Sequence, residues 1–179
     1  TPCGPNEYAE MGEGPARRFV YAAQLTSLAD LERKRSSRFD LDHWPYERAR
    51  VLYARDGRVA AAVEAAGRMD PAFRKARLAH ATVDAQVAWR RSIKTRDRGF
   101  EAGVALLSAR GAWALARVLF ALEGRWVPLD HWLEREIATL EDPTRAGDKL
   151  LETLRERRPE ALGEGLALLE DRLAAEGVP

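Results

Sequence analysis

The sequence predicts a mainly α protein, a helical bundle with a small N-terminal appendage of strand and helix. Ala, Leu, Arg and Glu dominate the 179 residues while Ile is scarce, which favours helix over strand by intrinsic propensity. Apolar residues recur at spacings of three and four, and the Asp-Pro pairs at 70–71 and 142–143 are typical helix starts. We therefore divide the chain into an N-terminal loop and α/β remnant, residues 1–57, and a helical bundle, residues 58–179.

Composition narrows the classes of function. The 29 basic and 28 acidic residues nearly balance, so the chain has no large net positive charge that would attract nucleic acid. Nucleic acid is therefore not an expected partner. The one cysteine, Cys3, excludes an internal disulfide framework and a thiolate zinc site, and it fits a reducing cytoplasm. No run approaches the roughly 18 apolar residues of a membrane span, and no signal-peptide pattern opens the chain. We expect a cytoplasmic protein that does not bind membranes.

The first elements of the chain are predicted from local composition. Residues 1–16 are rich in Gly and Pro and are expected to form a loop. Residues 18–25 are the best strand candidate because they are β-branched and aromatic, with a helical turn as the alternative. Thr26 or Ser27 then caps a short helix that ends near Lys34.

An Asp-x-Asp pair, Asp40 and Asp42, precedes a proline. Two carboxylates at this spacing point the same way on a strand, which is one way to hold a divalent metal through oxygen ligands. We favour the structural alternative, in which Asp42 caps the next turn, and we predict no metal site. Residues 49–53 continue as a helix or a short strand, and an Ala-rich helix is expected over residues 59–69.

The bundle is predicted to contain several helices with short connections. A long helix over residues 71–93 starts at Asp70, which caps it ahead of a proline. The most basic stretch of the chain, residues 90–99, follows and ends in a glycine that breaks the helix. Two further helices are expected over residues 142–157 and 158–176, the second ended by a glycine.

The longest apolar periodic segment predicts the central helix. The apolar side chains of residues 113–122 would cover well over half of the circumference of a helix, as expected for a helix buried on most sides. Residues 100–109 lead into this helix. Gly124 stands where a left-handed residue would end it, and Asp130 is expected to cap a second helix that runs to Leu140. The corner between the two helices, residues 125–129, is rich in aromatic and charged side chains. Any site of this chain is expected near that corner.

Five short motifs carry a family resemblance. They are ARVLY, KTRDRG, LFAL, RWVP and HWL, at residues 49–53, 94–99, 119–122, 125–128 and 131–133. Together they resemble the helical C-terminal domain of polymerase-beta-type nucleotidyltransferases, of the minimal and antibiotic-modifying kinds. The resemblance covers roughly residues 18–140.

The resemblance implies transfer of a nucleoside monophosphate from a nucleoside triphosphate to a hydroxyl, with Mg²⁺. Such chemistry needs a Gly-Ser loop for the phosphates and an Asp-x-Asp pair for the metal ions. The sequence has no Gly-Ser dipeptide, and its only Asp-x-Asp pair lacks such a loop. Because the chain also begins at Thr1 in mid-loop composition, we expect an upstream catalytic domain or a partner chain to supply the catalytic residues. The chain alone is expected to hold no catalytic residue and to be inactive. Mg²⁺ and a nucleoside triphosphate are expected to bind only when the catalytic domain or partner chain is present.

The resemblance also implies which residues contact phosphate. Lys94, Arg96 and Arg98 would reach the triphosphate across an interdomain cleft, where donors in a partly desolvated site stabilise developing charge. Lys94 and Arg98 share a face if the helix persists that far, and Asp97 is a further cleft candidate. The alternative is that this basic stretch is a solvated helix end.

Arg125 and His131 are the remaining cleft candidates, and their spacing also resembles the Arg-x(4–6)-His pattern of the HEPN family of helical ribonucleases. That resemblance implies a homodimer in which His131 acts as general acid or base on RNA while Arg125 stabilises phosphate charge. A structural explanation competes, in which Trp126 packs on Trp132 and Arg125 meets the carbonyl end of the central helix. A third reading is a non-catalytic module whose Trp-rich faces bind a partner.

Overall fold

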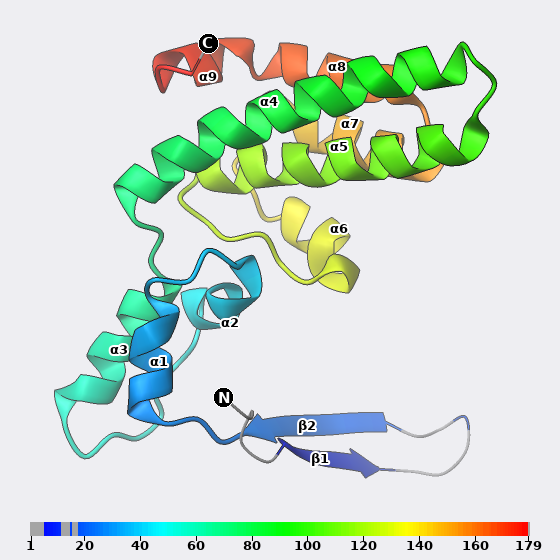
Figure 1. Cartoon of the computed structure of the whole chain (residues 1–179). Coiled ribbons are helices and arrows are strands. Elements are labelled where there is room, and N and C mark those ends of the chain that lie inside the picture. Colours follow the sequence, from blue (N-terminus) through cyan, green and yellow to red (C-terminus); the bar gives the residue numbers. More distant parts are fainter. Residues whose placement is uncertain (1–5, 12–14, 16–17, 179) are drawn as a thin grey trace.

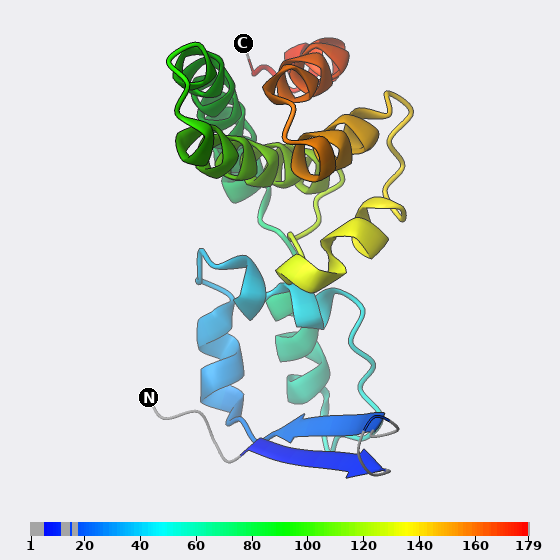
Figure 2. The ribbon, with the colours of Figure 1, turned by 90° about the vertical axis from the view of Figure 1, so that its right-hand side faces the viewer.

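The chain folds into two parts that lie one above the other, an N-terminal part and a helical bundle (Figure 1). The structure is a computed structural model that describes residues 6–11, 15 and 18–178. Helices make up most of the described chain, so the predicted mainly α class is confirmed. Figure 2, turned by 90°, shows the bundle as layered helices above the smaller part.

The N-terminal part opens with an antiparallel hairpin of β1 (Asn6–Met11) and β2 (Arg18–Gln24), with a bulge at Ala9 and Glu10. The predicted strand is therefore confirmed, but the predicted loop over residues 1–16 is wrong for residues 6–11. Those residues become a strand because β2 supplies their backbone hydrogen-bond partners, and local composition does not report a partner further along the chain. The other residues of the predicted loop, Pro15 excepted, lie outside the described residues.

Four short helices complete this part: α1 (Leu28–Lys34), the 3₁₀ helix η2 (Asp40–Asp42), α2 (Trp44–Glu47) and α3 (Gly57–Gly67). Ser27 caps α1 as predicted, since its Oγ accepts the Asp30 amide at 3.1 Å. The α3 helix packs on α1 and α2 around a small core of Leu31, Ala62 and Ala66. The α3 helix, which lies beyond residue 57, thus packs with the N-terminal part.

Two local predictions in this part are wrong. Residues 49–53 form neither helix nor strand, and Leu52 is 94% exposed. The pair Asp40 and Asp42 lies on η2 rather than on a strand, so the two carboxylates do not point the same way. Asp42 accepts the Ser37 hydroxyl at 2.6 Å and lies 3.5 Å from Lys34 Nζ, so it holds the end of α1 instead of capping the next turn.

The bundle begins with an antiparallel pair of long helices, α4 (Pro71–Arg96) and α5 (Glu101–Leu122). Asp70 caps α4 as predicted, because its Oδ1 accepts the amides of Ala72 at 2.9 Å and Phe73 at 3.0 Å. The segment expected only to lead into the central helix is the first half of α5 itself. Gly124 has a φ of +67° and ends the helix as predicted.

The α5 helix is the centre of the bundle core. By length and hydropathy it is one helix that could cross a membrane, but 56% of its most apolar window is buried inside the protein. Its neighbours α4, α7 and α8 cover it, as expected for a core helix. Gly111 permits the close approach of α8, because a Cβ there would collide with Leu162 and lie 3.1 Å from the Cβ of Ala88 on α4.

The remaining elements are η3 (Asp130–Trp132), α6 (Leu133–Ile137), α7 (Ala146–Glu156), α8 (Pro159–Leu168) and α9 (Glu170–Ala175). The helix expected over residues 130–140 is therefore shorter and begins as a 3₁₀ turn, without a side-chain cap from Asp130. The α7 helix begins at Ala146 rather than at residue 142, because Asp142 accepts the amides of Thr144 and Gly147 and closes a turn instead. The last predicted helix is divided at Leu169.

Candidate functional site

The predicted corner after α5 is where the bundle meets the N-terminal part. Its Trp126 is only 2% exposed and stacks on His43 with ring centroids 3.7 Å apart and planes within 6°. The indole Nε1 donates a hydrogen bond to the carbonyl of Gly67 at 3.0 Å. The predicted packing of Trp126 on Trp132 is wrong, because the Trp132 ring lies beside His131 and Arg135 instead.

The ring of His43 is buried between two backbone carbonyl groups. Its Nδ1 lies 2.6 Å from the Ala66 oxygen and its Nε2 lies 3.0 Å from the Ser37 oxygen. Both ring nitrogens thus face carbonyl oxygens, and these contacts fix the orientation of the ring against Trp126.

A buried carboxylate makes the second contact between the two parts. Asp40 is 7% exposed, accepts the Val127 amide at 3.1 Å and pairs with Arg77, which is also 7% exposed. The guanidinium of Arg77 lies over the Phe73 and Trp126 rings at 4.7 and 5.0 Å. Asp40 is thus part of the joint, the contact region in which the N-terminal part meets the bundle.

Glu47, the last residue of α2, makes the third contact. Its carboxylate accepts the backbone amide of Trp126 and lies 3.7 Å from Arg125 Nε. Burial raises the pKa of Glu47 from its usual 4.5 to about 7, against the lowering effect of the Trp126 amide and of the Arg125 and Arg48 charges. The group is therefore close to half ionised at neutral pH.

The charges around Glu47 act mainly against the effect of burial. Two guanidinium groups, Arg48 and Arg125, lie near it together with the carboxylates of Glu123 and Glu136. Arg125 lies 2.9 Å from Glu136 and 3.8 Å from Glu123, and Arg48 lies 3.6 Å from Glu136. Because both arginines also pair with Glu136, whose charge repels that of Glu47, they only partly offset the rise in the Glu47 pKa that burial causes.

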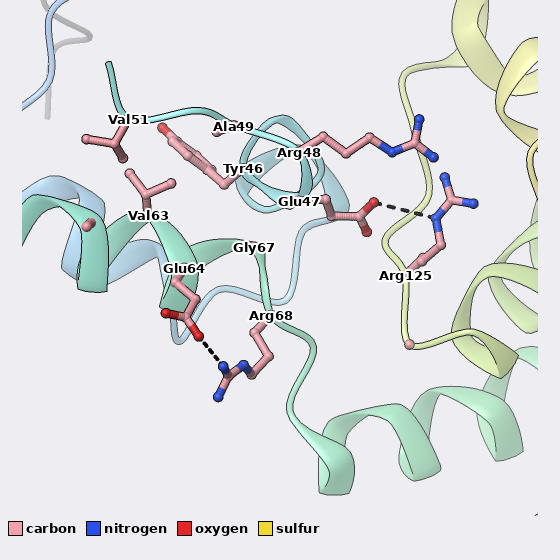
Figure 3. Close-up of a pocket in the computed structure, with 12 residues that line it drawn as sticks. Tyr46, Glu47, Arg48, Ala49, Val51, Val63, Glu64, Gly67, Arg68 and Arg125 are labelled. Carbon is pink, nitrogen blue, oxygen red and sulfur yellow. Dashed lines mark hydrogen bonds and ion pairs between the residues drawn. The ribbon is translucent and has the colours of Figure 1, made fainter. Parts of the chain in front are cut away.

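Glu47, Arg48 and Arg125 form one side of a cavity of about 560 Å³ between α2, α3 and the corner. Figure 3 shows Arg125 facing Glu47 from the corner segment, with Arg48 extending beside Glu47 toward it and with Glu64 and Arg68 of the α3 end on the other side of Glu47. Tyr46, Val51 and Val63 supply the apolar wall. A cavity of this size with a few convergent polar groups is suited to a small molecule, and its arginines favour an anionic one.

The predicted phosphate contacts lie elsewhere. Lys94, Arg96, Asp97 and Arg98 are exposed at the turn between α4 and α5, and α4 ends at Arg96, so Arg98 does not continue the face of Lys94. Arg96 pairs with Glu160 and lines a cavity of about 340 Å³ that Lys94 and Arg98 do not line. The 22 residues of α5, about 33 Å of helix, separate this turn from Arg125.

Arg125 and His131 also have different surroundings. Arg125 lines the corner cavity, and its backbone amide donates to the Phe120 carbonyl at 2.8 Å, so the predicted contact with the end of the central helix is made by its backbone. His131 is exposed on η3 and lines none of the described cavities. The structure does not bring these two residues into one cavity.

Sequence reasoning missed Glu47 and His43. Glu47 lies 79 residues from the amide that it accepts, and its neighbours in the sequence contain no pattern that points to Arg125. The only available signal was indirect, since both residues surround Pro45 in a segment of mixed aromatic and charged residues.

Among the described residues, no group of three or more His, Cys, Asp or Glu side chains is placed to hold a metal ion. Comparison with protein-family models, with curated proteins and with solved structures finds no match to this chain.

Proposed function

We propose that this chain is the helical, ligand-binding part of a nucleotidyltransferase-like protein, with the corner cavity as its ligand site. The observation that carries the proposal is Glu47, a carboxyl with a pKa of about 7 in a cavity bordered by Arg48, Arg68 and Arg125. Two of the motifs that resemble this family, residues 49–53 and 125–128, contribute to the walls of the same cavity. Their convergence supports a ligand site rather than a solvated surface.

The residues of the cavity suit the chemistry of nucleotidyl transfer. An acceptor hydroxyl attacks the α-phosphorus, a new P–O bond forms, the bond to pyrophosphate breaks, and the hydroxyl proton must go to a base. Glu47 would take that proton, because a base with a pKa near the working pH is efficient. The arginines would hold phosphate oxygens, and Mg²⁺ with its carboxylate ligands would come from the catalytic half.

The β1–β2 hairpin supports the position of that catalytic half. Among the described residues, β1 and β2 pair only with each other. A two-stranded sheet is marginally stable alone, so strands from an upstream domain or a partner chain would extend and stabilise it. A cytoplasmic location belongs to the same proposal and is supported by the single cysteine of the chain.

The test is calorimetric titration of ATP, with and without Mg²⁺, into the purified chain. Four forms are compared: the wild type, the cavity pair Arg48→Ala with Arg68→Ala, the turn pair Lys94→Ala with Arg98→Ala, and the control Arg155→Ala on α7. We expect the cavity pair alone to bind roughly tenfold more weakly, the loss of about two charge-assisted contacts at an exposed site.

Loss of binding only in the turn pair would move the nucleotide site to Lys94 and Arg98. Absence of binding by the folded wild-type chain would overturn the proposal. The chain alone is expected to transfer no nucleotide, so nucleotide incorporation into an acceptor by the purified chain would contradict the assignment of Mg²⁺ and its carboxylate ligands to another half.

A further inference from the structure

A larger groove lies along the α4–α5 pair, and it shares no lining residue with the corner cavity. Its volume is about 820 Å³, and its walls come from α4, α5, η3, α6 and α7. The residues that define its character are Val87, Arg91, Leu106, Arg110, Trp113 and Arg117. On α5, residues 106, 110, 113 and 117 follow one helical face, so the groove runs along the helix axis.

The end of the groove nearer the α4–α5 turn carries two arginines. Ala88 of α4 lies beside Gly111 of α5, so Arg91 and Arg110 are within about one helical turn of the same level. Both are exposed, and neither makes a side-chain hydrogen bond or an ion pair with any residue that the structure describes. Their donors are therefore available to an anion that would lie between the two helices.

The floor beside these arginines is apolar and open to solvent. Leu106 is 54% exposed and Val87 is 41% exposed, and Trp113 is only partly buried next to them. Exposed apolar side chains of this size, gathered in one groove and bordered by charge, are a feature of binding surfaces.

The end nearer the corner has a different charge pattern. Arg117 lies there with Asp130, and its Nε is 3.8 Å from Asp40 and buried without a hydrogen-bond partner among the described residues. Asp84 also lines the groove. This end is close to neutral, so an anionic group is attracted to the end near Arg91 and Arg110.

We infer that this groove binds a small amphipathic anion, a molecule with an aromatic or aliphatic body and one phosphate or carboxylate group. The anionic group lies between Arg91 and Arg110, and the apolar body covers Val87, Leu106 and Trp113. Polycationic molecules are disfavoured, because the three arginines would repel them. This site is additional to the proposed function and does not depend on it.

The experiment titrates four probes into the ¹⁵N-labelled chain and follows amide shifts by NMR. Naphthyl phosphate and naphthoate carry the two anionic groups on one apolar body, naphthylmethanol is the neutral analogue, and inorganic phosphate lacks the body. We expect naphthyl phosphate to shift amides of both α4 and α5 around Val87 and Leu106, and to bind roughly tenfold more tightly than either the neutral analogue or free phosphate.

Three variants separate the two halves of the site. Arg91→Ala with Arg110→Ala should weaken naphthyl phosphate about tenfold and leave naphthylmethanol unchanged, whereas Leu106→Ser should weaken all three naphthyl probes alike. The control pair, Arg145→Ala just before α7 with Arg155→Ala in its last turn, should change nothing. These positions are exposed, so the fold is retained.

Equal binding of the neutral and anionic probes, shifts confined to another face, or unchanged binding in the double arginine variant would each overturn the inference. Comparison of naphthoate with naphthyl phosphate tells which anion the groove prefers. No nucleotide is used, so failure here leaves the corner proposal standing, and failure of ATP binding leaves this site standing.

Discussion

The bundle is held together by apolar burial, whereas the N-terminal part has a small core and is attached through buried polar groups. The bundle core is continuous and includes Leu115, Phe120, Leu150 and Leu162, all fully buried. Among the side chains that the structure describes, the buried members of the N-terminal core are Leu31, Ala62 and Ala66.

The joint between the two parts is mostly polar. It consists of the Asp40–Arg77 pair, the contacts of Glu47 with Trp126 and Arg125, and the stack of His43 on Trp126. Apolar burial is insensitive to pH, but hydrogen bonds and charges at a buried joint are not. The comparison teaches that pH should affect the attachment of the N-terminal part, and with it the shape of the corner cavity, more than it affects the bundle core.

The largest effect is expected from the bundle core. Leu115→Ala removes a fully buried side chain from α5 and should lower the free energy of unfolding by about 4 kcal/mol, the transfer loss plus a cavity. Urea unfolding followed by far-UV circular dichroism measures this change. A loss below about 1 kcal/mol would show that the bundle relaxes around the cavity and that its core is not more rigid than the N-terminal part.

The next effect is expected at the joint. Asp40→Ala leaves the buried guanidinium of Arg77 and the Val127 amide without their acceptor and should cost about 3 kcal/mol. The double variant Asp40→Leu with Arg77→Met removes both charges and should recover most of that loss. Equal stability of the single variant and the wild type would mean that the ion pair does not hold the two parts together.

The small core gives the third test. Leu31→Ala should cost about 2 kcal/mol, because its neighbours Ala62 and Ala66 are small and can collapse only partly. We expect this loss of stability to be confined to the N-terminal part. Hydrogen exchange measured by mass spectrometry should show faster exchange in α1 and α3 and unchanged exchange in α5. Faster exchange throughout would indicate that the two parts unfold as one unit.

The last effect concerns proton binding at Glu47. Its pKa is raised in the folded protein to about 7 from 4.5, so between these two pH values the folded state binds a proton that the unfolded state has released. The free energy of unfolding should therefore fall as pH rises from 4.5 through 7, by at most about 3 kcal/mol in all, and stay low above it.

Glu47→Gln should remove this slope and make the protein more stable than the wild type above pH 7. Urea unfolding at about pH 5 and about pH 8 measures the difference, with the exposed cavity residue Glu64→Gln as the control. An unchanged slope in Glu47→Gln would assign the pH dependence to another group.

Sequence reasoning predicted the elements that local signals determine. The cap of Asp70, the left-handed Gly124 and the apolar face of residues 113–122 act within one or two helical turns, and all three are confirmed. The strand β1 and the start of α7 were missed, because β1 needs its partner β2 and Asp142 makes a turn with Thr144.

The corner was predicted as a region, but most of its contacts were not. Arg125 could be selected because it lies in a dense aromatic and charged motif, whereas Glu47 becomes a site residue only through burial by a segment far along the chain. Electrostatic properties of this kind depend on which charges the fold brings together, here Glu136 and Arg48 as well, and no pairwise spacing in the sequence contains that information.

The burial of Trp126 against His43 makes tryptophan fluorescence sensitive to the contact between the two parts. Trp126 is only 2% exposed while the two parts are joined, so its emission should shift to longer wavelength once they separate and water reaches the ring. The other four tryptophans are already partly exposed. The protein therefore carries its own fluorescent reporter for the opening of the corner, and no dye has to be attached to watch it.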